Sequence, residues 1–190
     1  MMVMKLQLEL SPAYKFPKVT QEFPEASDLR YSIYQKCIEK DQTTETTQAS
    51  LQLFNRVVRF SLERHQNKES AKLATSLFNK RNLTTAAIAC IHLASKYFEV
   101  MPYTTRERAV HNMESELYHK VFQGDISQTA PMTFINLIMG AWPEAELIHI
   151  EKLANIASMM CLLNKDLLPF RTSVLAVACL EITLHRLNMS

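Results

Sequence analysis

The side chains best suited to acid–base or metal chemistry in this 190-residue chain are its six histidines and the carboxylates near them. The histidines are scattered, and no nucleophile–base pair is apparent. His111 has Glu107 and Glu114 within helical reach, a spacing that can hold a metal but is more often a solvated helix face. His92 lies in an almost uniformly apolar stretch, where a core histidine is the commoner interpretation. We therefore predict no enzymatic activity, no cofactor and no metal.

Two charged residues, Lys96 and Glu114, stand at the edges of otherwise apolar segments. A charge in such a place is either a solvated cap or a contact with a partner. Lysine near the C-terminus of a helix is favourable for the helix dipole alone. Composition by itself therefore favours the solvated cap.

The segment from Arg56 to Arg81 is basic. It holds seven Lys or Arg residues and two acidic ones, whereas the whole chain has a net charge of +2. The segment is either a solvated face or a docking site for acidic or phosphorylated partners. For the second function the candidate residues are Arg56, Arg59, Arg64, Lys68 and Lys72.

Composition excludes several classes of protein. The chain has two glycines, Gly124 and Gly140, too few for a phosphate-binding loop and unfavourable for tight β-hairpins. Its near-neutral charge argues against direct nucleic-acid or membrane binding. The four cysteines lie far apart in sequence without a C-x-x-C pair, which indicates buried thiols in a reducing, intracellular compartment.

Apolar residues recur at helical spacing, so we predict an all-α fold. An extended arm is expected over 1–25 and a polar connector over 41–50. One of the helices is traced by Leu147, Ile150, Leu153, Ala157 and Met160, and we expect Met160 to fill a gap in the core. The expected helices span 27–40, 48–65, 69–81, 84–98, about 105–124, 131–140, about 147–160 and 172 onward.

Two apolar helices look alike, which indicates an internal repeat. Residues 87–94 read AIACIHLA and residues 176–183 read AVACLEIT, and the preceding segments LFNKRNL and LLNKDLL also correspond. Two copies of one helical unit packed together would give this pattern. We predict an N-terminal arm and helix over 1–47, a first unit over 48–127 and a second, incomplete unit over 128–190.

The order of these elements resembles that of the cyclins, whose fold has two helical boxes, each with a buried third helix. The motif LASKYFE at 93–99 is similar to the signature at the end of that helix. Met113-Glu114 resembles the start of the fifth helix of the box, and PMTFI at 131–135 resembles the proline-initiated second box. The resemblance covers about residues 26–190 and implies cyclin-like tandem boxes preceded by an N-terminal helix.

Cyclins bind and activate cyclin-dependent protein kinases. The resemblance thus implies a regulatory subunit that acts in cell-cycle or transcription control, in the nucleus or the cytoplasm. It implies that Lys96 and Glu114 hydrogen-bond backbone groups of the kinase, and we add Tyr97 and Tyr118 to this contact. Leu29 and Ile33 of the preceding helix are expected to lie partly on the first box and partly on the kinase. A chain without residues 1–41 would then still fold.

Two other functions remain open. A transcription scaffold similar to transcription factor IIB would share the two-box fold and bind DNA, but that family usually has a stronger basic balance and often a zinc ribbon, neither of which is present. A cyclin-like adaptor would bind its partner without activating it, and the short segment between Lys96 and Glu114 fits this function.

Overall fold

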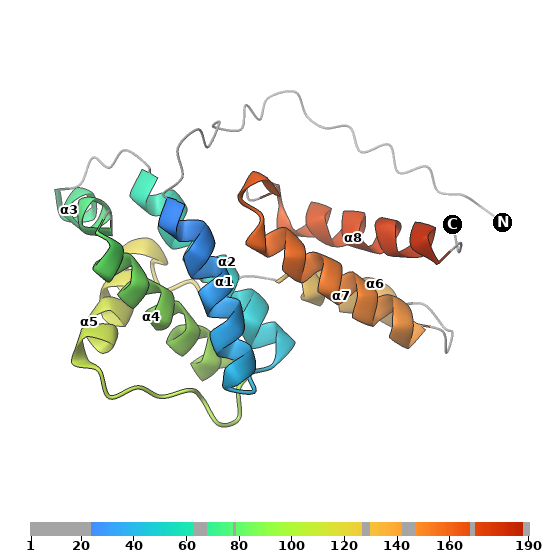
Figure 1. Ribbon diagram of the computed structural model, residues 1–190, viewed down its shortest axis with the longest axis horizontal. Coiled ribbons are helices and arrows are strands. Elements are labelled where there is room, and N and C mark those ends of the chain that lie inside the picture. The colour runs from blue at the N-terminus through green and yellow to red at the C-terminus, as the bar shows by residue number, and fades with distance from the viewer. Residues whose placement is uncertain are drawn as a thin grey trace.

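The computed structural model describes residues 24–62, 68–77, 79–126, 130–141, 147–167 and 170–187. Within these ranges the chain is helical and has no strand, which confirms the predicted all-α class. Figure 1 shows two groups of helices, α1 to α5 on one side and α6 to α8 on the other. The elements are α1 (Pro24–Glu39), α2 (Thr44–Leu62), α3 (Lys68–Leu77), α4 (Lys80–Phe98), α5 (Arg108–Glu116), the π-helix η1 (Leu117–Val121), α6 (Pro131–Gly140), α7 (Leu147–Leu163), the 3₁₀-helix η2 (Lys165–Leu167) and α8 (Thr172–Arg186).

The central helix of the first group is α4, which packs against α1, α2, α3 and α5. Its small side chains, among them Ala86, Ala89 and Ala94, are buried and let the neighbouring backbones approach closely. The helix begins at Lys80, four residues before the predicted start, because Asn79 caps it: the Asn79 side-chain oxygen accepts a hydrogen bond from Arg81 N at 2.9 Å.

The polar stretch 41–50, predicted as a connector, is mostly helix. α2 begins at Thr44, and Thr46, Thr47, Gln48 and Ser50 are all buried. Two of these side chains bond the backbone one turn earlier, since Thr47 Oγ1 donates to Thr43 O at 2.9 Å and Ser50 Oγ donates to Thr46 O at 2.7 Å. The polar composition therefore marks a buried helix surface and not a solvated connector.

The first helix, α1, is part of the first core. It starts at Pro24, a residue suited to a first turn, and not at Ser27 as predicted. Ala26, Ile33 and Cys37 are buried, and Arg30 Nε donates to Asn55 Oδ1 at 2.7 Å. Ile33 is 1% exposed and enclosed between α1 and the rest of the first group, so the predicted kinase contact has almost no surface of this side chain to use.

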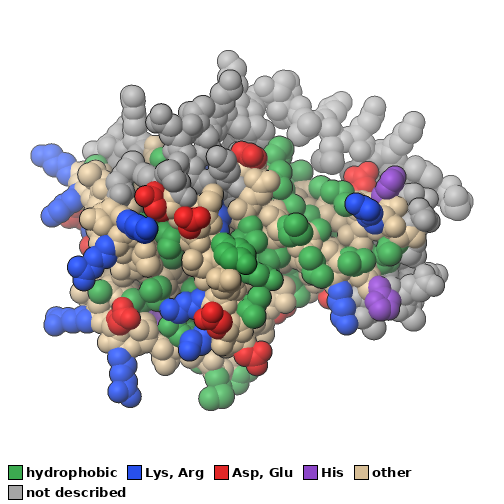
Figure 2. Space-filling view, in the orientation of Figure 1, with side chains coloured by type: hydrophobic (Ala, Val, Ile, Leu, Met, Phe, Trp, Pro, Cys, Tyr) green, Lys and Arg blue, Asp and Glu red, His purple; other side chains and the backbone are tan. Residues whose placement is uncertain are grey.

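The second group has a smaller core of its own, formed by Ile135, Met139, Ile150, Ala154, Ala176, Cys179 and Leu180. Helix α7 contributes to both cores, because Met159 and Leu162 near its C-terminal end pack into the first. Met160, predicted to fill a gap in the core, is 66% exposed, and Leu153 is 43% exposed, since the buried face of α7 runs through Ile150, Ala154 and Ser158. Figure 2 shows hydrophobic side chains on the surface of this group.

A polar seam joins the two groups. The buried amide of Gln48 donates from Nε2 to Ser158 Oγ on α7 at 2.7 Å, and its Oε1 accepts from Met132 N on α6 at 3.0 Å. Nearby, Asn55 Nδ2 donates to Leu162 O at 3.3 Å. These directed bonds fix how α6 and α7 sit on α2.

Glu99, the last residue of the LASKYFE motif, ties the end of α4 to the start of α2. Its Oε1 accepts hydrogen bonds from Thr43 N at 2.7 Å, Thr43 Oγ1 at 2.8 Å and Thr46 Oγ1 at 2.5 Å. Burial raises the pKa of Glu99, but the hydrogen bonds from Thr46 and Thr43 outweigh it, so the pKa lies below its ordinary value. The carboxylate thus caps α2 from a different helix.

We expect Glu99→Gln to lower the free energy of unfolding by about 1–2 kcal/mol at neutral pH, the usual cost of a lost helix cap. Because the folded-state pKa is depressed, the stabilisation is present above the ordinary glutamate pKa and is lost as pH falls through the folded-state value. Urea denaturation at neutral and acid pH measures both effects. The exposed Glu181→Gln is the control, and equal stability of the two variants at neutral pH would contradict the capping role.

Among the described residues, no helix combines the length and hydrophobicity that crossing a bilayer requires.

Candidate partner-binding site

Lys96 and Glu114, singled out from the sequence, form an ion pair. Lys96 lies in the last turn of α4, and Glu114 lies on α5, which packs beside α4. Lys96 Nζ donates to Glu114 Oε1. The Lys96 side chain is 43% exposed and that of Glu114 is 13% exposed, so the pair lies at the surface with its acidic member more enclosed.

The other carboxylate oxygen of Glu114 faces two histidines. His92 Nδ1 lies 2.5 Å and His111 Nδ1 lies 3.8 Å from Glu114 Oε2. Burial raises the pKa of Glu114. The hydrogen bonds from Lys96 and His92 and the positive charge around the carboxylate lower the pKa by more than burial raises it, so it lies below its ordinary value. Glu114 is therefore held as an anion.

An apolar rim, formed by Tyr97, Phe98, Val100 and Met101, follows Lys96 in sequence. Tyr97 is 61% exposed, Val100 is fully exposed and Met101 is 87% exposed. The segment after α4 is held by a hydrogen bond from Tyr103 N to Ser95 Oγ. Four exposed large apolar side chains within five residues of the Lys96 of an ion pair are typical of protein–protein contacts.

The remaining residues predicted to contact the kinase pack on or inside the first core. Tyr118 on η1 and Leu29 on α1 are half-buried and pack against the first core, while Ile33 is inside it. The candidate contact surface thus consists mainly of Lys96, Tyr97 and Glu114. Only part of each side chain of Leu29 and Tyr118 is accessible to a partner.

The predicted docking site for acidic partners is altered at Arg56. Its Nη1 donates to Asp125 O at 2.8 Å, and its Cζ lies 5.1 Å from the centre of the Phe122 ring. The guanidinium group of Arg56 is therefore engaged in contacts within the chain, which makes it a poor candidate for binding an acidic partner. Arg59, Lys68 and Lys72 are exposed, and their role in docking acidic partners stays a prediction. Arg64 lies outside the described residues. Figure 2 shows Lys and Arg side chains along the outer edge of the first group.

Sequence reasoning missed three parts of this region. It did not place His92 beside Glu114, although His92 lies one turn before Lys96 on the same face of α4, which was the available signal. It named Glu107 as the third member of the histidine and carboxylate group, whereas Glu107 is exposed at the start of α5. It also passed over Val100 and Met101, because isolated apolar residues in a loop carry no periodic pattern.

No protein-family model and no curated protein matches this sequence. Among solved structures, the fold is similar to that of a viral cyclin from herpesvirus saimiri, with a TM-score of 0.70. The likeness covers 92% of this chain and 79% of the viral cyclin at 15% sequence identity. At this identity the likeness concerns the fold, and the chain has a cyclin-like fold.

Proposed function

We propose that this protein is the regulatory subunit of a cyclin-dependent protein kinase, which it binds through Lys96, Glu114 and the apolar rim. The observation that carries the proposal is the ion pair of Lys96 and Glu114, whose half-exposed lysine is followed in sequence by four exposed large apolar side chains. The cyclin-like fold supports it. The protein would act in the nucleus or the cytoplasm, in cell-cycle or transcription control.

The ion pair is suited to binding a partner's backbone. An ammonium group has three donors, so Lys96 keeps two for carbonyl groups after bonding Glu114. A carboxylate has several lone pairs, so Glu114 can accept a backbone N–H while it holds Lys96. Because Glu114 already orients Lys96, less side-chain entropy is lost on binding.

Activation of a kinase requires a preference for its active arrangement, in which a helix glutamate pairs with the strand lysine. Shifting that equilibrium from 1:99 to 99:1 takes about 5.5 kcal/mol of differential binding. Fully burying one large apolar side chain contributes about 1.5–3 kcal/mol, so two to four residues of the rim suffice if they contact only the active arrangement.

The test is binding of purified cyclin-dependent kinase subunits to the wild-type chain and to Lys96→Ala, with kinase activity measured in parallel. We expect binding, a rise in activity, and a dissociation constant at least about 30-fold weaker in Lys96→Ala, the low end of the cost of removing one partner of an interface charge pair. The control is Lys152→Ala on α7, an exposed lysine outside this region.

Each outcome of this test bears on one part of the proposal. Equal affinity of Lys96→Ala and wild type would show that the contact lies elsewhere. Binding without a rise in activity would contradict activation and identify the chain as an adaptor. Absence of binding to every kinase tested would overturn the proposal.

A further inference from the structure

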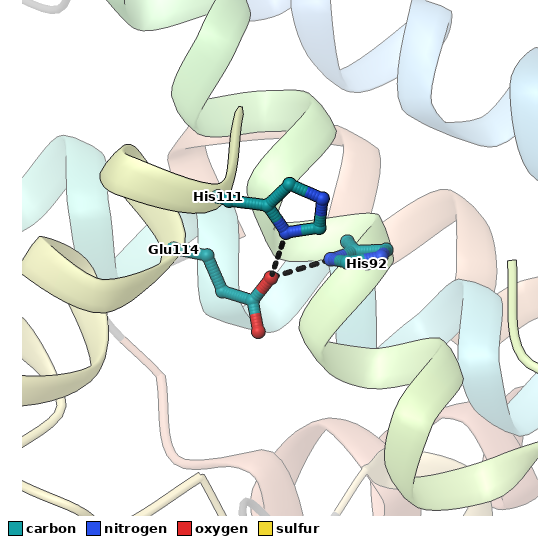
Figure 3. A group of neighbouring side chains, drawn as sticks. All are labelled: His92, His111 and Glu114. Atoms are coloured by element: carbon teal, nitrogen blue, oxygen red, sulfur yellow. Dashed lines mark hydrogen bonds and ion pairs between the residues drawn. The ribbon is translucent and has the colours of Figure 1, made fainter. Parts of the chain in front are cut away.

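Glu114 also belongs to a cluster with two imidazole rings, one from α4 and one from its own helix (Figure 3). The ligating atoms of His92, His111 and Glu114 all lie within 4.8 Å of one another. The two rings are 5.1 Å apart between centres and inclined at 71°, so they approach edge to face and not as a stack. Two nitrogens and one oxygen therefore lie close enough together to be drawn onto one metal ion.

The ring of His111 is oriented by a backbone carbonyl. His111 Nε2 lies 2.8 Å from Thr105 O and donates its hydrogen to that carbonyl. A neutral ring then carries its lone pair on Nδ1, the atom that faces Glu114 Oε2 at 3.8 Å. Metal-binding histidines are commonly held in this way, with one nitrogen donating to a carbonyl and the other facing the metal.

The two oxygens of Glu114 have separate environments. Oε1 accepts the hydrogen bond from Lys96, whereas Oε2 faces both histidines. Lys96 therefore fixes the carboxylate without occupying the oxygen that would bind a metal. His92 Nδ1 lies within hydrogen-bond distance of Oε2, and a metal ion bound by the three atoms would replace that hydrogen bond and draw His111 Nδ1 closer.

The spacing of the donor atoms is close to that of a zinc site. Tetrahedral zinc with bonds of about 2.0–2.2 Å places neighbouring donor atoms about 3.3–3.5 Å apart. The observed separations from Glu114 Oε2, 2.5 Å to His92 and 3.8 Å to His111, lie on either side of this value. Binding requires His92 and Glu114 to move about 1 Å apart and His111 to approach Glu114, and the exposed side of His111 leaves room for water as the fourth ligand.

We propose that His92, His111 and Glu114 form a binding site for one divalent transition-metal ion, with zinc the best match. Two imidazole nitrogens and a carboxylate oxygen suit zinc and exclude magnesium and calcium, which prefer oxygen ligands. The site does not depend on the proposed kinase contact, although the two share Glu114.

Calorimetric titration of the full chain with zinc tests the proposal, because the experiment contains no kinase and is independent of the proposed function. We expect binding of one equivalent, and His111→Ala should weaken it at least about tenfold, since the loss of even an outer-shell partner of a metal ligand costs about 10–100-fold. Removal of the exposed His111 avoids disturbing the core, unlike removal of His92. The matched control is His119→Ala, which removes an exposed histidine on η1.

The thiol pair of the second group is the competing zinc ligand and needs its own control. Cys161 Sγ and Cys179 Sγ are 3.6 Å apart, and the hydrogen bond with Cys179 lowers the pKa of Cys161 to about 7. We expect Cys161→Ser to bind zinc like the wild type. The cobalt form should show the visible bands of a four-coordinate ion without a thiolate charge-transfer band.

Three results would overturn the proposal: no zinc binding by the wild type, equal binding by His111→Ala and His119→Ala, or loss of binding in Cys161→Ser. Thermal melting gives a second readout, because a ligand that binds only the folded state raises the melting temperature. Zinc should stabilise the wild type and His119→Ala but not His111→Ala.

Discussion

A chain that begins at residue 42 is expected not to fold cooperatively. Without α1 the first core loses Ala26, Ile33 and Cys37, which are buried, and the faces of α2 and α4 that α1 covers meet water. Loss of Ile33 from the core forfeits about 1.5–3 kcal/mol, the uncovered faces of α2 and α4 add to this cost, and proteins of this kind have about 5–15 kcal/mol in total. Circular dichroism melting should therefore show no cooperative transition.

A peptide of residues 24–41 added in trans separates loss of packing from aggregation of the shortened chain. We expect it to restore a melting transition, and the same peptide with Ile33→Asp should not, because the buried position cannot accept an unpaired charge. A cooperative transition in the shortened chain alone would show that α1 is dispensable, as the sequence had indicated.

The largest effect of a single substitution is expected at Phe54 on α2. Its side chain is fully buried in the first core, and Phe54→Ala should lower the free energy of unfolding by about 3–5 kcal/mol through lost burial and the cavity left behind. For a chain of this size the melting temperature should fall by about 6–20 °C.

Leu137 on α6 supplies the control for Phe54, because it is 73% exposed. We expect Leu137→Ala to change stability by no more than about 0.5 kcal/mol. A comparable loss in both variants would mean that stability is not concentrated in the first core.

The sequence was informative where a local signal determines the structure. Pro131 begins α6 as predicted, and Gly124, with φ of +79°, follows η1 in the conformation that ends a helix, with its N–H bonded to Tyr118 O at 3.0 Å. The apolar run of α4 was likewise identified as an enclosed helix, because residues that are apolar on every face need neighbours on every side.

The sequence was misleading where the partner lies far along the chain. The polar start of α2 is buried because Gln48 bonds residues on α6 and α7 that are 84 and 110 positions away, and no local pattern records this. For the candidate site, the charges of Lys96 and Glu114 stood out in the sequence and their role came from family resemblance. His92 is 1% exposed, which confirms its assignment to the core, but its carboxylate partner lies on another helix and was not predicted.

The sharing of α7 between the two cores has a consequence for how the chain matures during synthesis. The first core takes Met159 and Leu162 from a helix that follows all of its other elements in sequence. A nascent chain that has emerged only as far as η1 therefore has every other helix of the first core, yet the places of these two side chains are unfilled and the apolar walls around them face water. The first helices to leave the ribosome thus complete their packing only after α7 has emerged as well.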